Sequence, residues 1–299
     1  MLLGCTGEVG SRLTLSLVNL GIKVFGTRSS RECKVNHPLH SCIEVNLLES
    51  DIKLEIESIK PELLIHAAWY TEPINFWESS QNFKWTKSSQ KIIDVFKKSG
   101  GRYLIVTGSC GEYSWNSSKS LSESSLEEPA STYGKARLEL LKWVRNQNLP
   151  FLWTRTFFQF GMNEATGRLI PSLIDSFLVG KPYIIRKPLD VRDFVYIEDV
   201  VQILSDLIRL EHRGVVNIGS GVGVRTEKMA IKIAELMNSS KLLRLDRTYE
   251  ISSSVVSNSQ NLTSLIGDYS WVPLDEALQK SIQARMNLEN HDALQSYRA

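Results

Sequence analysis

Three glycines near the start of the chain are spaced like a loop that can hold a nucleotide phosphate. Gly4, Gly7 and Gly10 form a G-x-x-G-x-x-G pattern that leads into a helix-like run, Ser11–Leu20. Such a loop lets the backbone pass close to a dinucleotide pyrophosphate, while the following helix supplies oriented N–H donors and a partial positive charge. By itself the pattern also fits an ordinary tight turn.

A second group of chemically capable residues lies about a hundred residues further on. Ser109 follows a predicted strand, and Tyr133 opens a predicted helix in which Arg137 comes four residues later. Because positions i and i+4 share one face of a helix, Tyr133 and Arg137 can converge on one ligand. A turn serine and a tyrosine packed on a sheet are the structural alternatives for Ser109 and Tyr133.

Alternating elements in the first half of the chain would bring these two groups together. Short apolar runs bounded by Gly or Pro alternate with stretches of helical spacing. The predicted strands are Val24–Thr27, Glu62–Ala68, Tyr103–Thr107 and Phe151–Thr156, and the predicted helices are Val9–Leu20, Phe76–Ser99 and Tyr133–Asn146. This alternation predicts an α/β fold with a doubly wound parallel (Rossmann) sheet, whose ligands bind beyond the carboxyl ends of the strands.

The second half predicts a smaller mixed lobe, with helices over 168–178, 226–237 and 275–286 and a strand over 215–218. We expect a dinucleotide-binding domain formed by residues 1–157 plus about 189–218. The substrate-binding lobe would comprise 158–188 plus 219–286, followed by a frayed tail, 287–299. Only Met1, Leu2 and Leu3 precede the glycine loop, whereas a central strand has about five residues. Either the first strand is short or the start of the protein lies upstream.

Composition indicates an ordinary soluble protein. Of 299 residues, 42% are hydrophobic and 23% charged, and the net charge of +2 gives no basic surface of the kind that binds nucleic acid. There is no apolar stretch of about 18 residues and no signal-peptide pattern, so we expect a cytoplasmic protein without a membrane partner. The four cysteines show no C-x-x-C spacing, which favours reduced thiols and no metal site over disulfides or zinc. They are Cys5, Cys33, Cys42 and Cys110.

The order of several short motifs resembles an extended short-chain dehydrogenase/reductase, of the NAD(P)-dependent nucleotide-sugar epimerase/dehydratase family. The motifs run nearly end to end, and their order and spacing together make the resemblance specific. They are the glycine loop, His66-Ala67-Ala68, Val106-Thr-Gly-Ser109, Pro129-Ala-Ser-Thr-Tyr133-Gly134, Arg192-Asp193-Phe194, Asn217-Ile-Gly-Ser-Gly221 and Trp271-Val-Pro273.

The resemblance implies catalytic roles for Tyr133, Ser109 and Arg137. Tyr133 would exchange a proton with a sugar hydroxyl or ketone, and Ser109 would hydrogen-bond the same oxygen. A phenol has a pKa of about 10, so a fixed cation is needed to make it a useful base near neutrality. The family places a lysine four residues after the tyrosine, where this chain has Arg137, and the two cations are not interchangeable at a tight site. We expect Arg137→Lys to preserve or raise turnover.

The cofactor expected from the sequence is NADP(H), with NAD as the alternative. NAD-binding folds place an acidic residue after the second strand, and Arg28 stands there, where it could bind a 2′-phosphate with help from Arg12. A solvated loop arginine is the alternative for Arg28. The complete set of expected cofactor contacts is Gly4, Gly7, Glu8, Val9, Gly10, Arg12, Arg28, Asn46, Leu47, Ala67, Ala68, Tyr133 and Arg137.

The expected substrate is a nucleotide-activated sugar. Cys110 and Gly111 stand where related 4,6-dehydratases carry an acidic pair, and Gly111 replaces the cysteine of related 3,5-epimerases, so 4-keto reduction or 4-epimerisation remains. By resemblance, Arg192 would clamp the diphosphate. Arg168 falls in the substrate pocket, and Trp69 and Tyr70 are expected to form its walls. We expect Trp77 and Trp85 in the core or an interface instead, and His66 as a structural residue.

Two other functions fit the same sequence. The Arg137 substitution and the short first strand would also suit a dinucleotide-binding regulatory or scaffold protein that has lost catalysis. A reductase of small aldehydes or flavonoid-like ketones shares the fold, although the Arg192 match argues against it. By analogy with the family, a homodimer would form through Phe76–Ser99 and Tyr133–Asn146.

Overall fold

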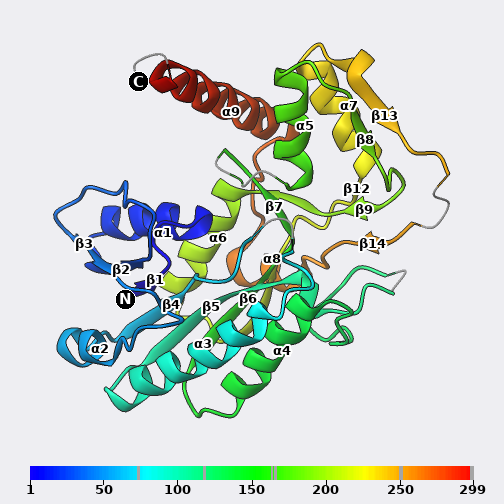
Figure 1. The fold of residues 1–299 in the computed structure, drawn as a ribbon. Helices are drawn as coiled ribbons and strands as arrows, with labels where there is room; N and C mark the ends of the chain where they lie inside the picture. The colour runs from blue at the N-terminus through cyan, green and yellow to red at the C-terminus, as the bar shows by residue number, and fades with distance from the viewer. Residues whose placement is uncertain (73–74, 117–118, 163, 165–166, 249–251, 297–299) are drawn as a thin grey trace.

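The computed structural model describes residues 1–72, 75–116, 119–162, 164, 167–248 and 252–296 (Figure 1). Its larger part is built on a seven-stranded sheet with the order β11-β6-β5-β4-β1-β2-β3, in which all neighbours are parallel. The strands are β1 (Leu2–Leu3), β2 (Val24–Arg28), β3 (His40–Glu44), β4 (Leu63–His66), β5 (Tyr103–Ser109), β6 (Phe151–Thr156) and β11 (Gly214–Ile218). The order reverses between β1 and β4, which is where ligands bind in doubly wound folds.

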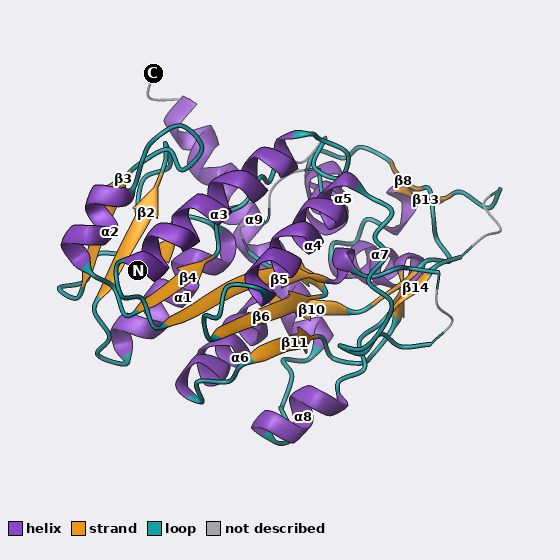
Figure 2. Cartoon of the chain, turned by 90° about the horizontal axis from the view of Figure 1, so that it is seen from below, coloured by secondary structure: helices purple, strands orange, loops and turns teal. Residues whose placement is uncertain are grey.

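Helices cover both faces of this sheet, as the α/β Rossmann prediction requires (Figure 2). The helices on one face are α1 (Glu8–Asn19) and α6 (Ile197–Arg209), and those on the other are α2 (Lys53–Ile59), α3 (Gln81–Lys98) and α4 (Thr132–Arg145). Consecutive strand residues point to opposite faces. Leu64 and Ile65 of β4 accordingly belong to the two different apolar cores.

The first strand is short but fully inside the sheet. Leu2 and Leu3 are both fully buried, and Leu2 lies between Gly26 of β2 and Ile65 of β4. The backbone N–H of Cys5 donates to the Thr27 carbonyl at 2.9 Å, so the chain stays attached to the sheet as it turns into the glycine loop. Two strand residues are therefore enough to place this loop at the carboxyl edge.

A smaller lobe packs around a third apolar core, which contains Ile174, Met229 and Leu278. Its elements are α5 (Leu169–Leu178), β8 (Tyr183–Ile185), α7 (Thr226–Leu236), η2 (Ser240–Leu242), β13 (Leu243–Leu245) and α9 (Leu274–Ser296). Short pairs near the junction are β7 (Phe158–Phe160) with β10 (Phe194–Tyr196), and β9 (Val191–Arg192) with β12 (Val224–Arg225) and β14 (Ser254–Val255).

Two segments differ from the predicted domain boundaries. Helix α8 (Gln260–Ile266) lies in the range assigned to the substrate lobe, yet its Leu262 is buried in the same core as α6 and β11. Helix α9 continues to Ser296, past the frayed tail expected from Asn287, because a polar run without Gly or Pro can remain helical. Among the described residues, no helix is both long and apolar enough to cross a membrane.

Candidate functional site

The glycine loop forms a tight cradle at the carboxyl edge of β1. Gly4 has a φ of 83°, in the left-handed region that favours glycine. A Cβ added to Gly10 would lie 2.1 Å from the Gly4 carbonyl oxygen, so only glycine lets α1 approach the strand this closely. Gly7 is the N-cap of α1 and has no side chain to cover the N–H groups of the first turn. The loop therefore has the close backbone approach and the uncapped N–H groups that a dinucleotide pyrophosphate requires.

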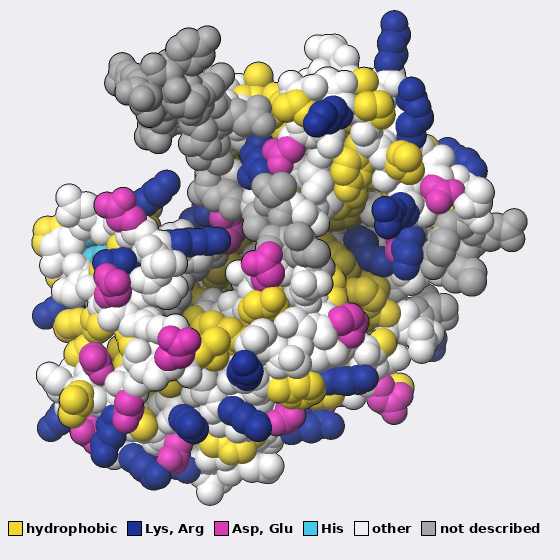
Figure 3. All heavy atoms as spheres, in the orientation of Figure 1, with side chains coloured by type: hydrophobic (Ala, Val, Ile, Leu, Met, Phe, Trp, Pro, Cys, Tyr) yellow, Lys and Arg dark blue, Asp and Glu magenta, His cyan; other side chains and the backbone are white. Residues whose placement is uncertain are grey.

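This cradle opens into a cavity of about 1640 Å³ that also contains the predicted catalytic residues. In the space-filling view, hydrophobic side chains gather in the middle of the molecule, between its two lobes (Figure 3). The predicted site residues that line the cavity are Gly4, Gly7, Glu8, Val9, Arg12, Arg28, Asn46, Leu47, Ala67, Ala68, Trp69, Tyr70, Ser109, Tyr133, Arg137 and Arg168. Gly10 and Arg192 are not among the described residues that line it.

Tyr133 lies in the cavity wall with Ser109 close by. The tyrosine is 8% exposed, and its ring packs on Phe76 at 4.3 Å and edge-on to Trp77 at 5.5 Å between ring centroids. Burial raises the pKa of Tyr133, while the Arg137 charge and a hydrogen bond with Ser109 act in the opposite direction. The net shift is upward, so the phenol is held in its protonated form at neutral pH.

Arg137 occupies the position of the family's lysine, and contacts within the protein hold its guanidinium in place. The side chain is 1% exposed, and the guanidinium carbon lies 4.2 Å from the ring centroid of Trp69 and 5.2 Å from that of Trp153. It also donates a hydrogen bond to the backbone carbonyl of Thr107. The cation therefore acts on the pKa of Tyr133 through space, from a site closed in by two indole rings.

Glu112 is a buried residue next to the site, and the sequence analysis gave it no role. It lies in η1 (Cys110–Glu112), is fully buried, and accepts a hydrogen bond from the backbone N–H of Ser109 at 2.9 Å. Trp153 Nε1 and Arg155 Nε donate to the same carboxylate at 2.9 and 2.7 Å. Ser109 and Glu112 form a capping box, so the S-x-x-E spacing was the available signal. This network fixes the backbone that carries Ser109.

The arginines expected to bind a 2′-phosphate are already paired with carboxylates. Arg28 donates to Glu44, its neighbour on the adjacent strand β3. Arg12 lies 3.1 Å from a carboxylate oxygen of Glu8 and 2.8 Å from one of Glu198. Neither guanidinium is an uncompensated positive charge in the cavity.

The predicted substrate residues divide into two groups. Arg168 is the N-cap of α5, and its guanidinium lies 5.7 Å from the ring centroid of Phe76 inside the cavity. Arg192 lies behind the wall instead, bonded to Asp190 at 2.6 Å and to Ser253 Oγ at 2.9 Å. Its guanidinium lies 5.2 Å from the ring centroid of Phe158, which does line the cavity. Arg192, which was predicted to clamp the diphosphate, therefore packs on the Phe158 ring behind the cavity wall and does not itself line the cavity.

Trp77 and Trp85 lie at the cavity, whereas His66 is a buried structural residue. Trp77, expected in the core or an interface, lines the cavity, because the chain before α3 folds back over Tyr133. Trp85, of which the same was expected, lies within α3, where it packs against the core and also lines the cavity. The Trp69 indole donates to Asn82 at 2.9 Å and lies 6.2 Å from the Trp85 ring. His66 is fully buried, and its Nε2 lies 2.8 Å from Ser89 Oγ. Burial, reinforced by the Arg137 charge, lowers the pKa of His66 to about 3, which keeps the ring neutral in a structural role.

The comparisons with known proteins agree with this geometry. The NAD dependent epimerase/dehydratase family matches residues 1–219. Over 198 residues the chain is 28% identical to an Arabidopsis thaliana trifunctional UDP-glucose 4,6-dehydratase/UDP-4-keto-6-deoxy-D-glucose 3,5-epimerase/UDP-4-keto-L-rhamnose-reductase, a match that covers 62% of this chain and 29% of that enzyme. The chain thus spans less than a third of the length of the curated relative.

Solved structures share the fold over almost the whole chain. The UDP-glucose 4-epimerase of Thermotoga maritima, solved with UDP-glucose, superposes with a TM-score of 0.83 at 20% identity and covers 96% of this chain and 98% of its own. MoeE5, solved with UDP-glucose and NAD, gives 0.81 at 22% identity with the same coverage. The glycine cradle, the sheet order and the family match agree, and the chain therefore belongs to the NAD-dependent epimerase/dehydratase family, the extended short-chain dehydrogenase/reductase branch that its motifs resemble.

Proposed function

We propose that this protein catalyses hydride transfer at C4 of a nucleotide-activated sugar, by 4-keto reduction or 4-epimerisation, with Tyr133 as the proton donor and acceptor. The observation that carries the proposal is the meeting of Tyr133 and Ser109 with the glycine cradle in one cavity. A nicotinamide dinucleotide, when bound, supplies or accepts the hydride. Gly4, Gly7 and the N-terminus of α1 would hold its pyrophosphate.

The chain's own residues handle the proton. Ser109 would hydrogen-bond the reacting sugar oxygen, and the protonated Tyr133 would donate to that oxygen as a ketone is reduced. In the reverse direction Tyr133 must accept the proton, which requires its phenolate. Arg137 supports the phenolate electrostatically, because its charge lowers the pKa of Tyr133. We therefore propose that Arg137 acts on Tyr133 through its charge, and that it does not donate hydrogen bonds to the cofactor ribose.

The structure supports NAD(H) over the NADP(H) preference predicted from the sequence. That preference depended on Arg28 and Arg12, and both are paired with carboxylates of the same chain: Arg28 with Glu44 at the surface, and Arg12 with Glu8 and Glu198. A 2′-phosphate would have to displace the Glu44 carboxylate and then lie beside it, which is electrostatically unfavourable. MoeE5, which shares the fold, is a complex with NAD.

Tyr133→Phe tests the proposal, because it removes the proton and leaves the ring packing intact. We expect kcat to fall by about 10² to 10⁴ fold across a panel of UDP- and TDP-sugars and their 4-keto forms. Dinucleotide binding, followed by NADH fluorescence, should be unchanged. Arg137→Lys should retain turnover, as the sequence predicts. Tyr183→Phe, on β8 of the smaller lobe, is the matched control and should behave like the unmodified protein.

The same assay separates the two reactions. A reductase consumes one NADH for each sugar, whereas an epimerase changes the sugar without a net change in NADH absorbance. A fully active Tyr133→Phe variant would refute the assignment of Tyr133. No turnover of any sugar by a protein that still binds dinucleotide would favour the regulatory or scaffold alternative, which the enclosure of Arg137 by Trp69 and Trp153 also suits.

The assembly state is a separate proposal. We propose a homodimer through α3 and α4, which lie together on one face of the sheet. Sedimentation velocity, which gives the mass of the particle in solution, tests it directly.

A further inference from the structure

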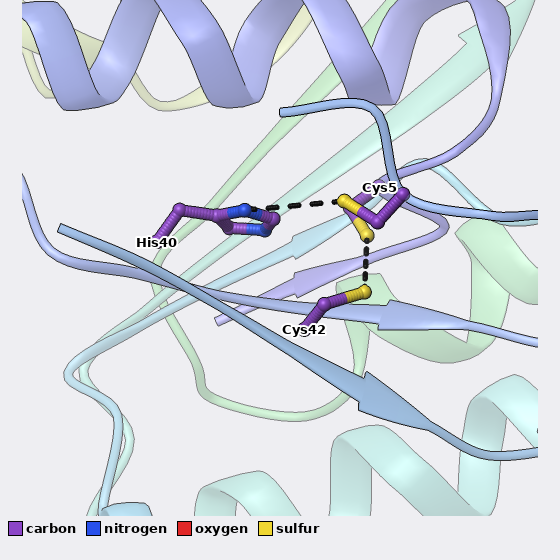
Figure 4. A group of neighbouring side chains, drawn as sticks. Cys5, His40 and Cys42 are labelled. Carbon is purple, nitrogen blue, oxygen red and sulfur yellow. Dashed lines mark hydrogen bonds between the residues drawn. The ribbon is translucent and has the colours of Figure 1, made fainter. Parts of the chain in front are cut away.

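Three of the four cysteines meet a histidine beneath the glycine loop. Cys5 belongs to the loop itself, Cys33 to the segment between β2 and β3, and His40 and Cys42 to β3. One ligand atom from each residue can be chosen so that all four lie within 4.8 Å of one another. Figure 4 shows Cys5, His40 and Cys42 pointing toward a common centre. The sequence prediction of no metal site rested on linear spacing, which does not show this arrangement.

The separations between these atoms resemble the edges of a zinc-centred tetrahedron. Cys5 Sγ lies 3.6 Å from Cys42 Sγ, and the four candidate ligand atoms all lie within 4.8 Å of one another. Zinc–sulfur bonds of about 2.3 Å and zinc–nitrogen bonds of about 2.0 Å give tetrahedral edges of about 3.8 Å for S···S and 3.5 Å for S···N. A shift of about 1 Å would bring even a separation of 4.8 Å close to these values.

His40 is oriented for a role as a ligand. Its Nδ1 lies 3.0 Å from the Val35 carbonyl oxygen, to which Nδ1–H can donate. Its Nε2 is buried and has no hydrogen-bond partner among the described residues. Metal-bound histidines commonly donate their other ring N–H to a backbone carbonyl in this way, which fixes the tautomer.

Gly26 of β2 keeps the space beside these atoms open. A Cβ at residue 26 would lie 2.7 Å from Cys5 Sγ and 2.9 Å from His40 Nε2. Any other residue would therefore fill the space between the imidazole nitrogen and the thiol. The unpartnered nitrogen and this space are observations independent of the cysteine spacing.

We propose that Cys5, Cys33, His40 and Cys42 bind one structural Zn²⁺ ion. Three thiolates and an imidazole are a donor set that zinc prefers, and four protein ligands leave no open position for catalysis. The ion would tie the segment between β2 and β3 to the glycine loop. That segment carries Arg31, Glu32 and Lys34, which line the cofactor end of the cavity. The site would thus hold the adenosine side of the dinucleotide pocket in shape.

Metal analysis of the purified chain tests this proposal without substrate or turnover. We expect about one zinc per chain, and a Co²⁺-substituted protein with thiolate charge-transfer and tetrahedral d–d absorption bands. Cys33→Ser and Cys42→Ser should each lose most of the bound metal. Cys110→Ala is the matched control, because Cys110 is the remaining cysteine and is buried in η1, directly after β5; it should keep the metal.

A second measurement keeps the test decisive if a cysteine variant fails to fold. Removal of zinc from the unmodified protein by a chelator should speed proteolytic cleavage within 29–39, and added Zn²⁺ should restore protection. Three results would overturn the proposal: a metal-free protein that takes up no Zn²⁺ when reduced, a Cys5–Cys42 disulfide found by mass spectrometry, or unchanged metal content in Cys42→Ser. None of them depends on which sugar, if any, is turned over.

Discussion

At the scale of single residues, the pairing of Arg28 with Glu44 bears on the proposed preference for NAD(H) over NADP(H). The two residues are register partners on the parallel strands β2 and β3, so their side chains lie on the same face of the sheet. The sequence shows Arg28 after the second strand but cannot show which residue lies beside it. That is why it predicts a phosphate-binding arginine, whereas the folded chain presents an ion pair.

Glu44→Gln should release Arg28 and shift the preference toward NADP(H). The variant removes the competing carboxylate without changing its size, so we expect the ratio of the NADPH and NADH dissociation constants to fall about tenfold, the contribution of one charge-assisted hydrogen bond. Fluorescence titration of both reduced dinucleotides measures this ratio. Glu62→Gln, which breaks the exposed pair with Arg102, is the control and should leave the ratio unchanged. An unaltered ratio in Glu44→Gln would show that Arg28 does not contact the ribose.

At the scale of elements, the hydrophobic pattern predicted well those strands and helices that have clear boundaries. The strand expected over Phe151–Thr156 is β6 to the residue, and α4 begins one residue before the predicted Tyr133. Strand β3 was assigned no bounds, because it is a partly exposed edge strand with a mixed sequence. The pattern predicted α3 from Phe76, whereas the helix begins at Gln81. The intervening aromatic residues that suggested helix and core form a cavity wall.

The network around Glu112 could not be predicted, because it joins elements far apart in the chain. Arg155 comes from β6 and bonds both Glu112 and Glu127, at 2.7 and 2.6 Å, while Arg145 of α4 bonds Glu127 from outside. Burial raises the pKa of Glu127, but hydrogen bonds from Arg145 and Arg155 outweigh it and lower the pKa to about 2. The capping box was visible in the sequence, but its buried partners were not.

Glu112→Gln should destabilise the protein while keeping the shape of the side chain. The substitution leaves the fully buried Arg155 with one carboxylate in place of two, so we expect the free energy of unfolding to fall by about 3 kcal/mol. Urea unfolding followed by tryptophan fluorescence measures the change. Arg145→Gln, at the exposed end of the same network, is the control and should cost less than about 1 kcal/mol. Equal losses in both variants would mean that Glu112 is not the centre of the network.

At the scale of the whole molecule, Glu164 lies where the two lobes meet. It lines the cavity, and its carboxylate oxygen lies 3.8 Å from Arg168 at the start of α5. Arg285 of α9 donates to its backbone carbonyl at 3.1 Å. Burial, with a smaller contribution from the Glu8 charge of α1, raises the pKa of Glu164, and the charges of Arg168 and Arg285 oppose the shift, which leaves the pKa at about 8. The closed junction thus favours a neutral carboxyl group.

This upward shift makes stability depend on pH in a defined direction. Glu164 has a folded-state pKa of about 8, above the ordinary value of 4.5, so its contribution to stability is complete below pH 4.5 and is lost as the pH rises through 8. Between these values the unfolded chain binds fewer protons than the folded one, and the free energy of unfolding should fall by up to about 1.4 kcal/mol per pH unit from this group.

Glu164→Gln should therefore be more stable than the unmodified protein at pH 9 and equally stable near pH 4. Urea unfolding at a series of pH values measures the difference, and subtracting the two curves cancels the titration of all other groups. Glu139→Gln, an exposed glutamate on α4, should reproduce the curve of the unmodified protein. Because Glu8 stands in the first turn of α1, an ionised Glu164 also adds negative charge near the proposed pyrophosphate position. Dinucleotide affinity should accordingly fall above pH 8 in the unmodified protein and not in Glu164→Gln, and parallel behaviour of the two would place Glu164 outside the binding site.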